Sequence, residues 1–143
     1  MKVEFANALL EQNDSTCIIL KDGQIIYTSS FIGVKPLLVF MENHRDVSPE
    51  GLVLVDKVIG KAALMLAARM RFRVIYTPVT SLAALASAKE LQISLNAAQV
   101  VPYIKNRTNT GMCPIEMSVL HTNDLEEAYV NINEAIRKLM AAN

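Results

Sequence analysis

The chain has 143 residues, of which 52% are hydrophobic and 20% are charged, and its 14 Lys and Arg residues balance 14 Asp and Glu residues. This length and composition predict one globular domain and exclude a disordered or acidic solvating chain. Zero net charge argues against nucleic acid as a partner, since such binders usually carry a basic surplus. No membrane span is expected either, because the longest segment without a charged residue, 74–88, is shorter than the roughly 20 residues that a spanning helix needs.

The start of the chain and its cysteines indicate a cytoplasmic protein. Glu4 lies where a signal peptide would have its apolar core, so export is not expected. The two cysteines, Cys17 and Cys113, lie far apart in the sequence and do not make a disulfide framework. Cys17 falls in a strand pattern and is expected in the core.

In chain order, the first half of the sequence predicts a helix, a β-hairpin and a second helix. Apolar residues at helical spacing indicate the first helix, and Asp22-Gly23 is a strong hairpin signal between two β-rich segments. Pro36 is acceptable in the second helix because it falls in the first turn. The expected elements are a helix at 2–12, strands at 15–20 and 24–28, and a helix at 33–43.

The second half alternates strands with helices. Residues 52–55 form a continuous aliphatic run, which suits a strand covered on both faces. The helix after it is rich in Ala, Leu and Met and is expected to begin with Asp56 as its N-cap. The expected elements are a strand at 52–55, a helix at 56–70, a strand at 73–77, a helix at 81–91, a strand within 99–104 and a helix at 124–140.

This order predicts an α/β three-layer (α-β-α) sandwich. Strands that alternate with helices favour βαβ units, and the early hairpin adds antiparallel strands, so we expect a mixed sheet of about five strands. We expect a single domain over 1–143, with a core at about 1–104 and a C-terminal extension of a loop and helices at about 105–143.

The junction between the aliphatic strand and the next helix is the first candidate site. Ligands of open α/β sheets bind at the carboxyl ends of strands, where a helix N-terminus favours an anion. Lys57 and Lys61 are four residues apart and can point from one side of the helix. Gly60 inside a helix indicates close packing or the close approach of a ligand. The alternative is that Asp56 only caps the helix and that the lysines are solvated.

The polar loop that follows the last strand is the second candidate site. Cys113 is expected as the N-cap of a short helix, with Pro114 at the first position and Glu116 at the third. A thiol at a helix N-terminus can be reactive, but Glu116 would repel a thiolate, and a cysteine in an apolar chain is more often a small buried residue. Arg107, beside Asn106, is the expected partner for an anion, because its forked guanidinium matches a carboxylate or a phosphate.

No metal site and no cofactor are expected. His44 and His121 are isolated, and the sequence contains no Cys-x-x-Cys or His-x-x-x-His motif. A structural zinc site needs several such ligands at close spacing, so the sequence predicts none.

Three segments carry a resemblance to a known family. They are Gly33-Val34-Lys35-Pro36-Leu37-Leu38, then Val55-Asp56-Lys57-Val58-Ile59-Gly60-Lys61-Ala62-Ala63, and finally Asn106-Arg107 with Gly111-Met112-Cys113-Pro114-Ile115-Glu116. Together they resemble a prokaryotic family of unknown function, domain of unknown function 1893, over nearly the whole chain. That family looks like the cytidine deaminase-like fold, so the resemblance implies this fold here.

The resemblance also implies a place for zinc, and this sequence departs from the pattern there. Zinc deaminases use a His or Cys and a nearby Glu on the helix after the hairpin, and Pro-Cys-x-x-Cys at the next strand-to-helix junction. Here Gly33-Val34-Lys35 and the segment 55–60 stand at these two places, so the zinc ligands and the general acid/base Glu are missing. Zinc-dependent deamination is therefore not expected.

Our leading hypothesis is a deaminase-fold protein without zinc that binds a small anionic ligand of the nucleotide or ribose-phosphate type. The candidate ligand-binding residues are Asp56, Lys57, Gly60, Lys61, Asn106, Arg107 and Glu116. The three cations Lys57, Lys61 and Arg107 would hold the anion, and Asp56 would accept hydrogen bonds from hydroxyl or amino groups. A second hypothesis is an enzyme that uses the thiolate of Cys113 for group transfer or redox chemistry. A third is a structural or regulatory module that assembles through its apolar surface, with a homodimer as the expected form.

Overall fold

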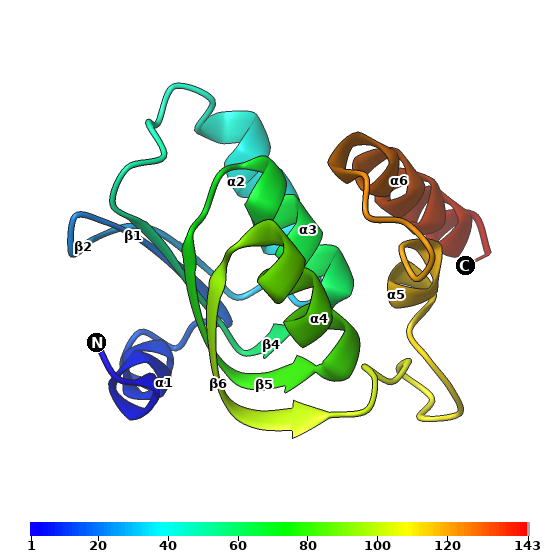
Figure 1. The fold of residues 1–143 in the computed structure, drawn as a ribbon, viewed down its shortest axis with the longest axis horizontal. Coiled ribbons are helices and arrows are strands. Elements are labelled where there is room, and N and C mark those ends of the chain that lie inside the picture. Colours follow the sequence, from blue (N-terminus) through cyan, green and yellow to red (C-terminus); the bar gives the residue numbers. More distant parts are fainter. Residues whose placement is uncertain (143) are drawn as a thin grey trace.

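A six-stranded mixed sheet forms the centre of the computed structural model, which describes residues 1–142 (Figure 1). The helices are α1 (Val3–Gln12), α2 (Lys35–Asn43), α3 (Lys61–Arg69), α4 (Leu82–Leu91), α5 (Pro114–Ser118) and α6 (Leu125–Ala142). The strands are β1 (Cys17–Lys21), β2 (Gln24–Ser29), β3 (Leu52–Asp56), β4 (Val58–Ile59), β5 (Val74–Ser81) and β6 (Ser94–Val101). The predicted α/β class and the mixed sheet are confirmed.

The sheet has an antiparallel half from the hairpin and a parallel half from the βαβ units. β1 pairs antiparallel with both β2 and β3, whereas β5 pairs parallel with β3, β4 and β6. Because β6 pairs along the whole of β5, β3 and β4 share the opposite side of β5. The hairpin turn has positive φ at both Asp22 (51°) and Gly23 (83°), as a two-residue type I′ turn requires.

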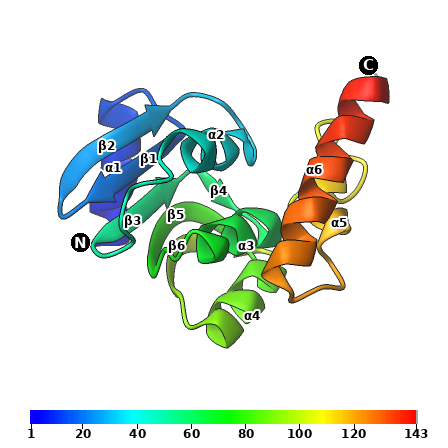
Figure 2. The ribbon, with the colours of Figure 1, turned by 90° about the horizontal axis from the view of Figure 1, so that it is seen from above.

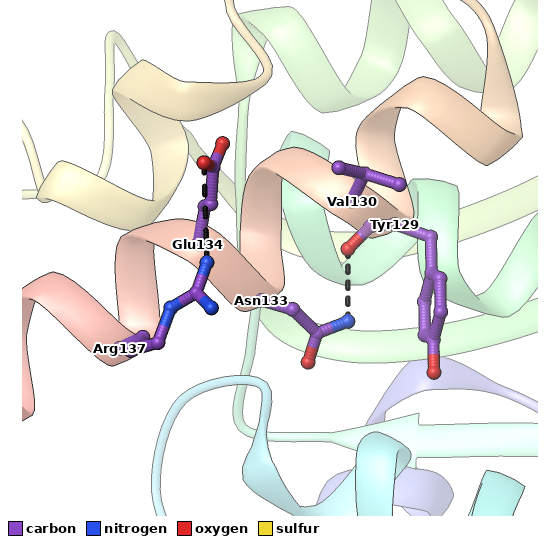
Figure 3. A pocket seen from close by; sticks show the side chains of 5 residues that line it. All are labelled: Tyr129, Val130, Asn133, Glu134 and Arg137. Atoms are coloured by element: carbon purple, nitrogen blue, oxygen red, sulfur yellow. Dashed lines mark hydrogen bonds and ion pairs between the residues drawn. The ribbon is translucent and has the colours of Figure 1, made fainter.

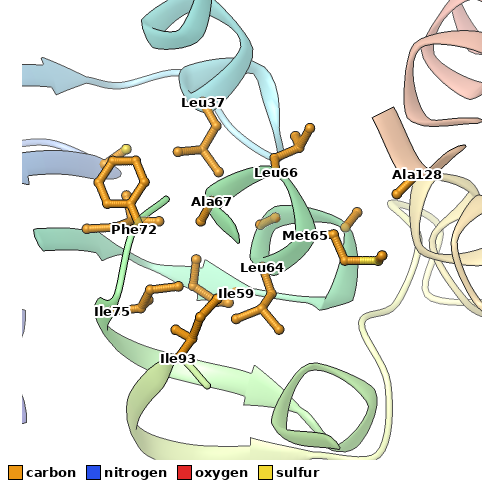
Figure 4. Packing of buried hydrophobic residues seen from close by; sticks show 14 of the residues in the cluster. Leu37, Ile59, Leu64, Met65, Leu66, Ala67, Phe72, Ile75, Ile93 and Ala128 are labelled. Carbon is orange, nitrogen blue, oxygen red and sulfur yellow. The ribbon is translucent and has the colours of Figure 1, made fainter. Parts of the chain in front are cut away.

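Helices cover both faces of the sheet (Figures 1 and 2). α1 packs on one face, over β3 and β5, around a small core formed by Ala6, Leu10, Ile18, Leu20 and Val55. The main core lies on the other face, beneath α2, α3 and α4, and its deepest element is α3, in which residues 61–67 are all buried. Figure 4 shows Leu64 of this helix beside Ile59 of the sheet, with Ala128 of α6 at the far end of the same cluster.

The C-terminal extension packs on the outer side of α3. Both α5 and α6 contact α3, and the side chain of Arg69 forms an ion pair with Glu126 at 3.0 Å. The guanidinium of Arg69 also lies 4.0 Å from the centre of the Tyr129 ring. The last turns of α6 project beyond the body of the domain (Figure 2), and Leu139 and Met140 are exposed there.

The helix predicted at 56–70 begins only at Lys61, so the prediction that Asp56 is its N-cap is wrong. The backbone nitrogen of Lys57 donates to the carbonyl of Thr16 at 2.9 Å, which keeps the chain extended after β3. The next two residues form β4 beside β5, and Gly60 is the N-cap of α3. An apolar pattern cannot separate a two-residue strand from the first turn of a helix, because both are too short to show a period.

The last strand begins at Ser94, not within 99–104 as predicted. Gln92 ends α4 in the left-handed conformation (φ 57°), so the chain turns directly into β6. No residue of β6 is buried, and the strand therefore lacks the apolar alternation by which strands are predicted. Within residues 1–142, no helix has the length and apolar character that a membrane crossing requires.

Candidate functional site

The first candidate segment lies at the edge of the sheet where β3 ends and α3 begins. β3 ends at Asp56, β4 follows at once, and α3 begins at Lys61. Helix α5 of the C-terminal extension contacts α3, so it brings Glu116 from the second candidate segment to this junction (Figure 1). Two segments that are distant in the sequence therefore meet here.

The carboxylate of Glu116 is bound at the N-terminus of α3. The backbone nitrogen of Lys61 donates to Oε1 at 2.7 Å, and that of Ala62 donates to Oε2 at 2.8 Å. N–H groups in the first turn of a helix have no partner within the helix, and the helix dipole favours negative charge beside them. An anion therefore does lie at this helix start, and it is a side chain of the C-terminal extension.

Gly60 leaves the space that this carboxylate fills. A Cβ at residue 60 would lie 2.3 Å from Oε1 and 2.5 Å from the carboxyl carbon of Glu116. Both distances are far shorter than van der Waals contact, so any larger residue would displace Glu116. The close approach that the sequence predicts at Gly60 is thus made by a side chain of the protein itself.

Lys61 completes this contact from the helix side. Only 7% of the residue is exposed, and its Nζ donates to the carbonyl of Leu120 at 3.2 Å, one helical turn after Glu116. Burial raises the pKa of Glu116 above its usual value, while the N–H groups of Ala62 and Lys61 and the charge of Lys61 act in the opposite direction. The three residues Gly60, Lys61 and Glu116 join the C-terminal extension to the core.

Asp56 is a buried carboxyl group with one free oxygen. Only 6% of the residue is exposed; Oδ1 accepts a hydrogen bond from the backbone nitrogen of Val58 at 3.3 Å, and Oδ2 has no hydrogen-bond partner. Burial raises the pKa of Asp56 to about 7, although hydrogen bonds to the carboxylate oppose the shift. At neutral pH the group therefore exists in both protonation states, and it can donate or accept a hydrogen bond.

Asp56 belongs to a polar row that crosses three strands. The register places Asp56 opposite Cys17, and Cys17 opposite Ser29. Directly paired residues point to the same face of a sheet, so the three side chains share the face that carries the main core. Cys17 is fully buried, which confirms its predicted core position, and burial together with Asp56 raises the pKa of its thiol. The sequence does not show this row, because strand pairing brings its members together.

Lys57 and the loop before α2 both contact Thr16, which precedes β1. Lys57 is exposed, and its backbone nitrogen binds the carbonyl of Thr16, whose hydroxyl donates to the carbonyl of Phe31. The loop before α2 therefore lies next to Lys57. Lys35, the first residue of α2, places its Nζ 4.1 Å from the centre of the Phe31 ring. Phe31 and Lys35 are not among the predicted site residues; a large apolar residue in an exposed loop was the available signal.

Asn106 and Arg107 lie in a loop with hydrogen bonds of its own. Oδ1 of Asn106 accepts from the backbone nitrogen of Thr110 at 2.9 Å, and Nδ2 donates to the Thr110 hydroxyl at 3.1 Å. Arg107 is exposed, and no hydrogen bond or ion pair in the part of the chain that the structure describes ties it to the β3–α3 junction. The predicted convergence of Arg107 with Lys57 and Lys61 stays a prediction.

Cys113 is the N-cap residue of α5, and Pro114 occupies the first helical position, as predicted. The backbone nitrogen of Cys113 donates to the carbonyl of Ile104 at 2.9 Å, and its side chain makes no capping hydrogen bond. The thiol is half-buried and packs against the main core. This is the setting of a packing residue, and the reactivity of Cys113 stays a prediction.

Two open depressions lie on the surface away from this edge. One, of about 440 Å³, follows α6 and is lined by Tyr129, Val130, Asn133, Glu134 and Arg137 (Figure 3). The other, of about 690 Å³, lies at the start of the chain and is lined by Met1, Lys2, Glu4 and Phe5. Each is lined by one short stretch of chain, so neither encloses a ligand from several sides.

Comparison with protein families matches residues 5–136 to TM1506, a domain of unknown function (DUF1893). The chain belongs to the DUF1893 family. A crystal structure described as a DUF1893 family protein from Thermotoga maritima is 27% identical in sequence, with a TM-score of 0.80. The similarity covers 95% of this chain and 88% of that chain. Comparison with curated protein sequences gives no match. The predicted DUF1893 membership is confirmed, and it names no activity.

Proposed function

We propose that this DUF1893 protein binds a small anionic molecule, of the nucleotide or ribose-phosphate type, at the edge of the sheet beside Asp56 and Lys57. The observation that carries the proposal is Oδ2 of Asp56, the one carboxylate oxygen among three buried side-chain atoms within residues 1–142 that have no hydrogen-bond partner. Such a group costs about 1–3 kcal/mol, so native proteins seldom keep one without a use. A hydroxyl or amino group of a ligand would be a partner for this oxygen.

Two lysines beside Asp56 provide positive charge for the anionic part of the ligand. Lys57 directly follows Asp56, and Lys35 begins α2 next to the loop that contacts Thr16. Neither ammonium group forms a hydrogen bond or an ion pair with another residue of 1–142. Helix α2 has no acidic residue in its first turn and no side-chain cap, so its dipole adds to the attraction of an anion.

The remaining predicted residues have different roles in this proposal. Gly60, Lys61 and Glu116 hold the junction in place through their contact with one another, and so they position Asp56 and Lys57. Asn106 and Arg107 stay candidates for a contact from the C-terminal loop.

We also propose that the fold is cytidine deaminase-like. The order of a helix, a hairpin, a helix and then alternating strands and helices supports this assignment. The residues at the edge do not suit the zinc ion of such folds, because the side chains there include the cations Lys35 and Lys57. No group of three His, Cys, Asp or Glu residues within 1–142 is placed to hold a metal ion.

Ligand titration tests the binding proposal. Ribose 5-phosphate and a panel of nucleoside monophosphates are titrated by calorimetry into the wild type and the Lys57→Ala and Lys35→Ala variants. We expect binding to the wild type and a loss of affinity of about ten- to a hundredfold in each variant, because one charge-assisted contact is worth about 1.5–3 kcal/mol. Lys138→Ala, on the exposed end of α6, is the matched control and should bind as the wild type does. Absence of binding to the wild type, or an equal loss in the control, would contradict the proposal.

Asp56→Asn separates the two parts of the site. This change should lower the affinity for sugar phosphates, because their hydroxyl groups contact residue 56. It should leave the affinity for inorganic phosphate, which is weaker, unaltered. Equal effects on sugar phosphates and inorganic phosphate would show that Asp56 does not contact the ligand.

A further inference from the structure

The outer edge of β6 is not paired with another strand within residues 1–142. This strand has eight residues, Ser94–Val101, and none of them is buried. Within residues 1–142 it contacts β5, α4 and α1, and no strand lies beyond it (Figure 1). Parallel strands are normally covered on both sides, so a strand whose residues are all exposed or only half-buried is unusual.

The pairing of β6 with β5 fixes which backbone groups are free. The nitrogen of Ser94 donates to the carbonyl of Arg73 at 2.9 Å, so Ser94 faces β5. In a parallel pair, each residue directs its N–H and C=O to one side, and successive residues alternate. Residues 96 and 100 therefore also bond to β5, the register has no pair at Ala98, and the outward groups belong to Leu95, Ala97, Gln99 and Val101.

This edge lacks every feature by which natural sheets avoid pairing with another strand. Charged residues, proline, bulges and very short strands are the usual protections. The sequence of β6, Ser-Leu-Asn-Ala-Ala-Gln-Val-Val, contains no charge and no proline. Its register with β5 runs from Val74 to Ser81 without a shift, and only Pro78 has no paired residue. The opposite edge of the sheet differs, because the register between β1 and β2 shifts at Ile19/Leu20.

The surroundings of β6 favour a second copy of the same chain as the partner. An uncharged strand can pair antiparallel with itself about a two-fold axis without placing like charges opposite each other. The alanines at 97 and 98 are small, which allows close approach near that axis. Exposed apolar side chains lie at the carboxyl end of the strand: Val100 is 45% exposed, Tyr103 is 39% exposed, and Leu82 is 59% exposed next to Ser81, the register partner of Val101.

We propose that two copies of this protein associate through antiparallel pairing of β6 with β6, which makes one continuous sheet across the dimer. The backbone groups of Leu95, Ala97, Gln99 and Val101 form the new hydrogen bonds. This inference is independent of the proposed ligand, since the edge at β6 and the polar row at Asp56 are on different strands.

Hydrogen exchange and mass measurement together test this pairing. The monomer has a mass of 15.8 kDa, so light scattering should report twice that value for the wild type. The amides of residues 96 and 100 are protected in either state because they bond to β5. The amides of 95, 97, 99 and 101 should be protected at least about tenfold at high protein concentration relative to dilute solution.

Two substitutions in β6 provide a second test of the pairing. Ala97→Pro removes an outward N–H that β5 does not use, and Gln99→Lys introduces like charges on the two paired strands. We expect both variants to be monomeric, with the far-ultraviolet circular dichroism of the wild type. Ile26→Lys, an equal charge on the exposed part of β2, is the matched control and should remain dimeric. If Ala97→Pro fails to fold, Gln99→Lys and the exchange pattern still decide the question.

A monomeric wild type at about 100 µM would overturn the proposal, because an unprotected edge would then remain unpaired. A dimer that persists in Gln99→Lys, or whose amides at 95, 97, 99 and 101 exchange freely, would also overturn it and would place the contact on another surface.

Discussion

Gly60 and Glu116 occupy one small volume at the start of α3. A Cβ on residue 60 would lie only 2.3 Å from Oε1 of Glu116. Two backbone N–H groups hold the carboxylate in this position. The N-terminus of α3 favours negative charge, and the carboxylate of Glu116 fits there only because residue 60 has no side chain. The identities of these two residues therefore depend on each other. This relationship fixes how the C-terminal extension sits on the core.

Gly60→Ala should destabilise the protein by about 1–3 kcal/mol, because the new methyl group displaces the carboxylate from its two hydrogen bonds. The free energy of unfolding in urea measures this change. Gly111→Ala is the matched control, since a Cβ there meets no atom within 4 Å. Equal stability of Gly60→Ala and the wild type would show that Glu116 moves aside without cost.

Glu116→Gln should also destabilise the protein by about 1–3 kcal/mol, since an amide accepts only one of the two N–H bonds and carries no charge for the helix dipole. Hydrogen exchange should in addition report faster opening of α5 and α6. Glu127→Gln, at an exposed position of α6, should leave both quantities unchanged. If the two variants behave alike, the carboxylate does not anchor the extension.

Stability should fall as pH rises through neutrality because of Asp56. Its pKa is raised from an ordinary value of 3.8 to about 7 in the folded protein, so the folded state binds more protons than the unfolded state between these values. The stabilisation is therefore complete below about pH 4 and is lost as pH rises through about 7, and the wild type should lose about 2–3 kcal/mol between pH 5 and 8.

Asp56→Asn should remove most of this pH dependence, because residue 56 then has no proton to lose. Urea unfolding at pH 5 and pH 8 measures the difference for each variant. Asp46→Asn, at an exposed position, should keep the slope of the wild type. A slope that survives in Asp56→Asn would assign the titration to another group.

The two cysteines should differ in their rates of modification. Cys17 is fully buried and its thiol pKa is raised, so a thiol reagent should reach it only after unfolding. Cys113 is half-buried and should react in the folded protein, faster than Cys17 does. Reaction of Cys113 much faster than that of a small free thiol in the same buffer would instead support an enzyme that uses this thiol.

Periodicity predicts most of this fold because local backbone geometry and one-sided burial leave a pattern in the sequence. The hairpin at Asp22-Gly23, the aliphatic strand β3 and the helices α1, α4 and α6 all have such patterns, and the structure has each of them. β4 and the first half of β6 have none, since one is two residues long and the other is unburied.

The candidate site, like the fold, is predicted in part from the sequence. The sequence by itself places Asp56, Lys57, Gly60 and Lys61 at the carboxyl end of a strand, because topology follows from element order. It also places Cys113 at a helix start and establishes membership of the DUF1893 family.

Only the tertiary structure decides what these residues touch. Glu116 and the N–H group of Lys61 are separated by 55 positions, and Cys17 meets Asp56 through strand pairing. Such contacts depend on how helices and strands pack, and no local pattern records them. The sequence therefore predicts that the start of α3 can hold an anion, whereas packing of the C-terminal extension decides that this anion is Glu116, and folding leaves Oδ2 of Asp56 without a hydrogen-bond partner.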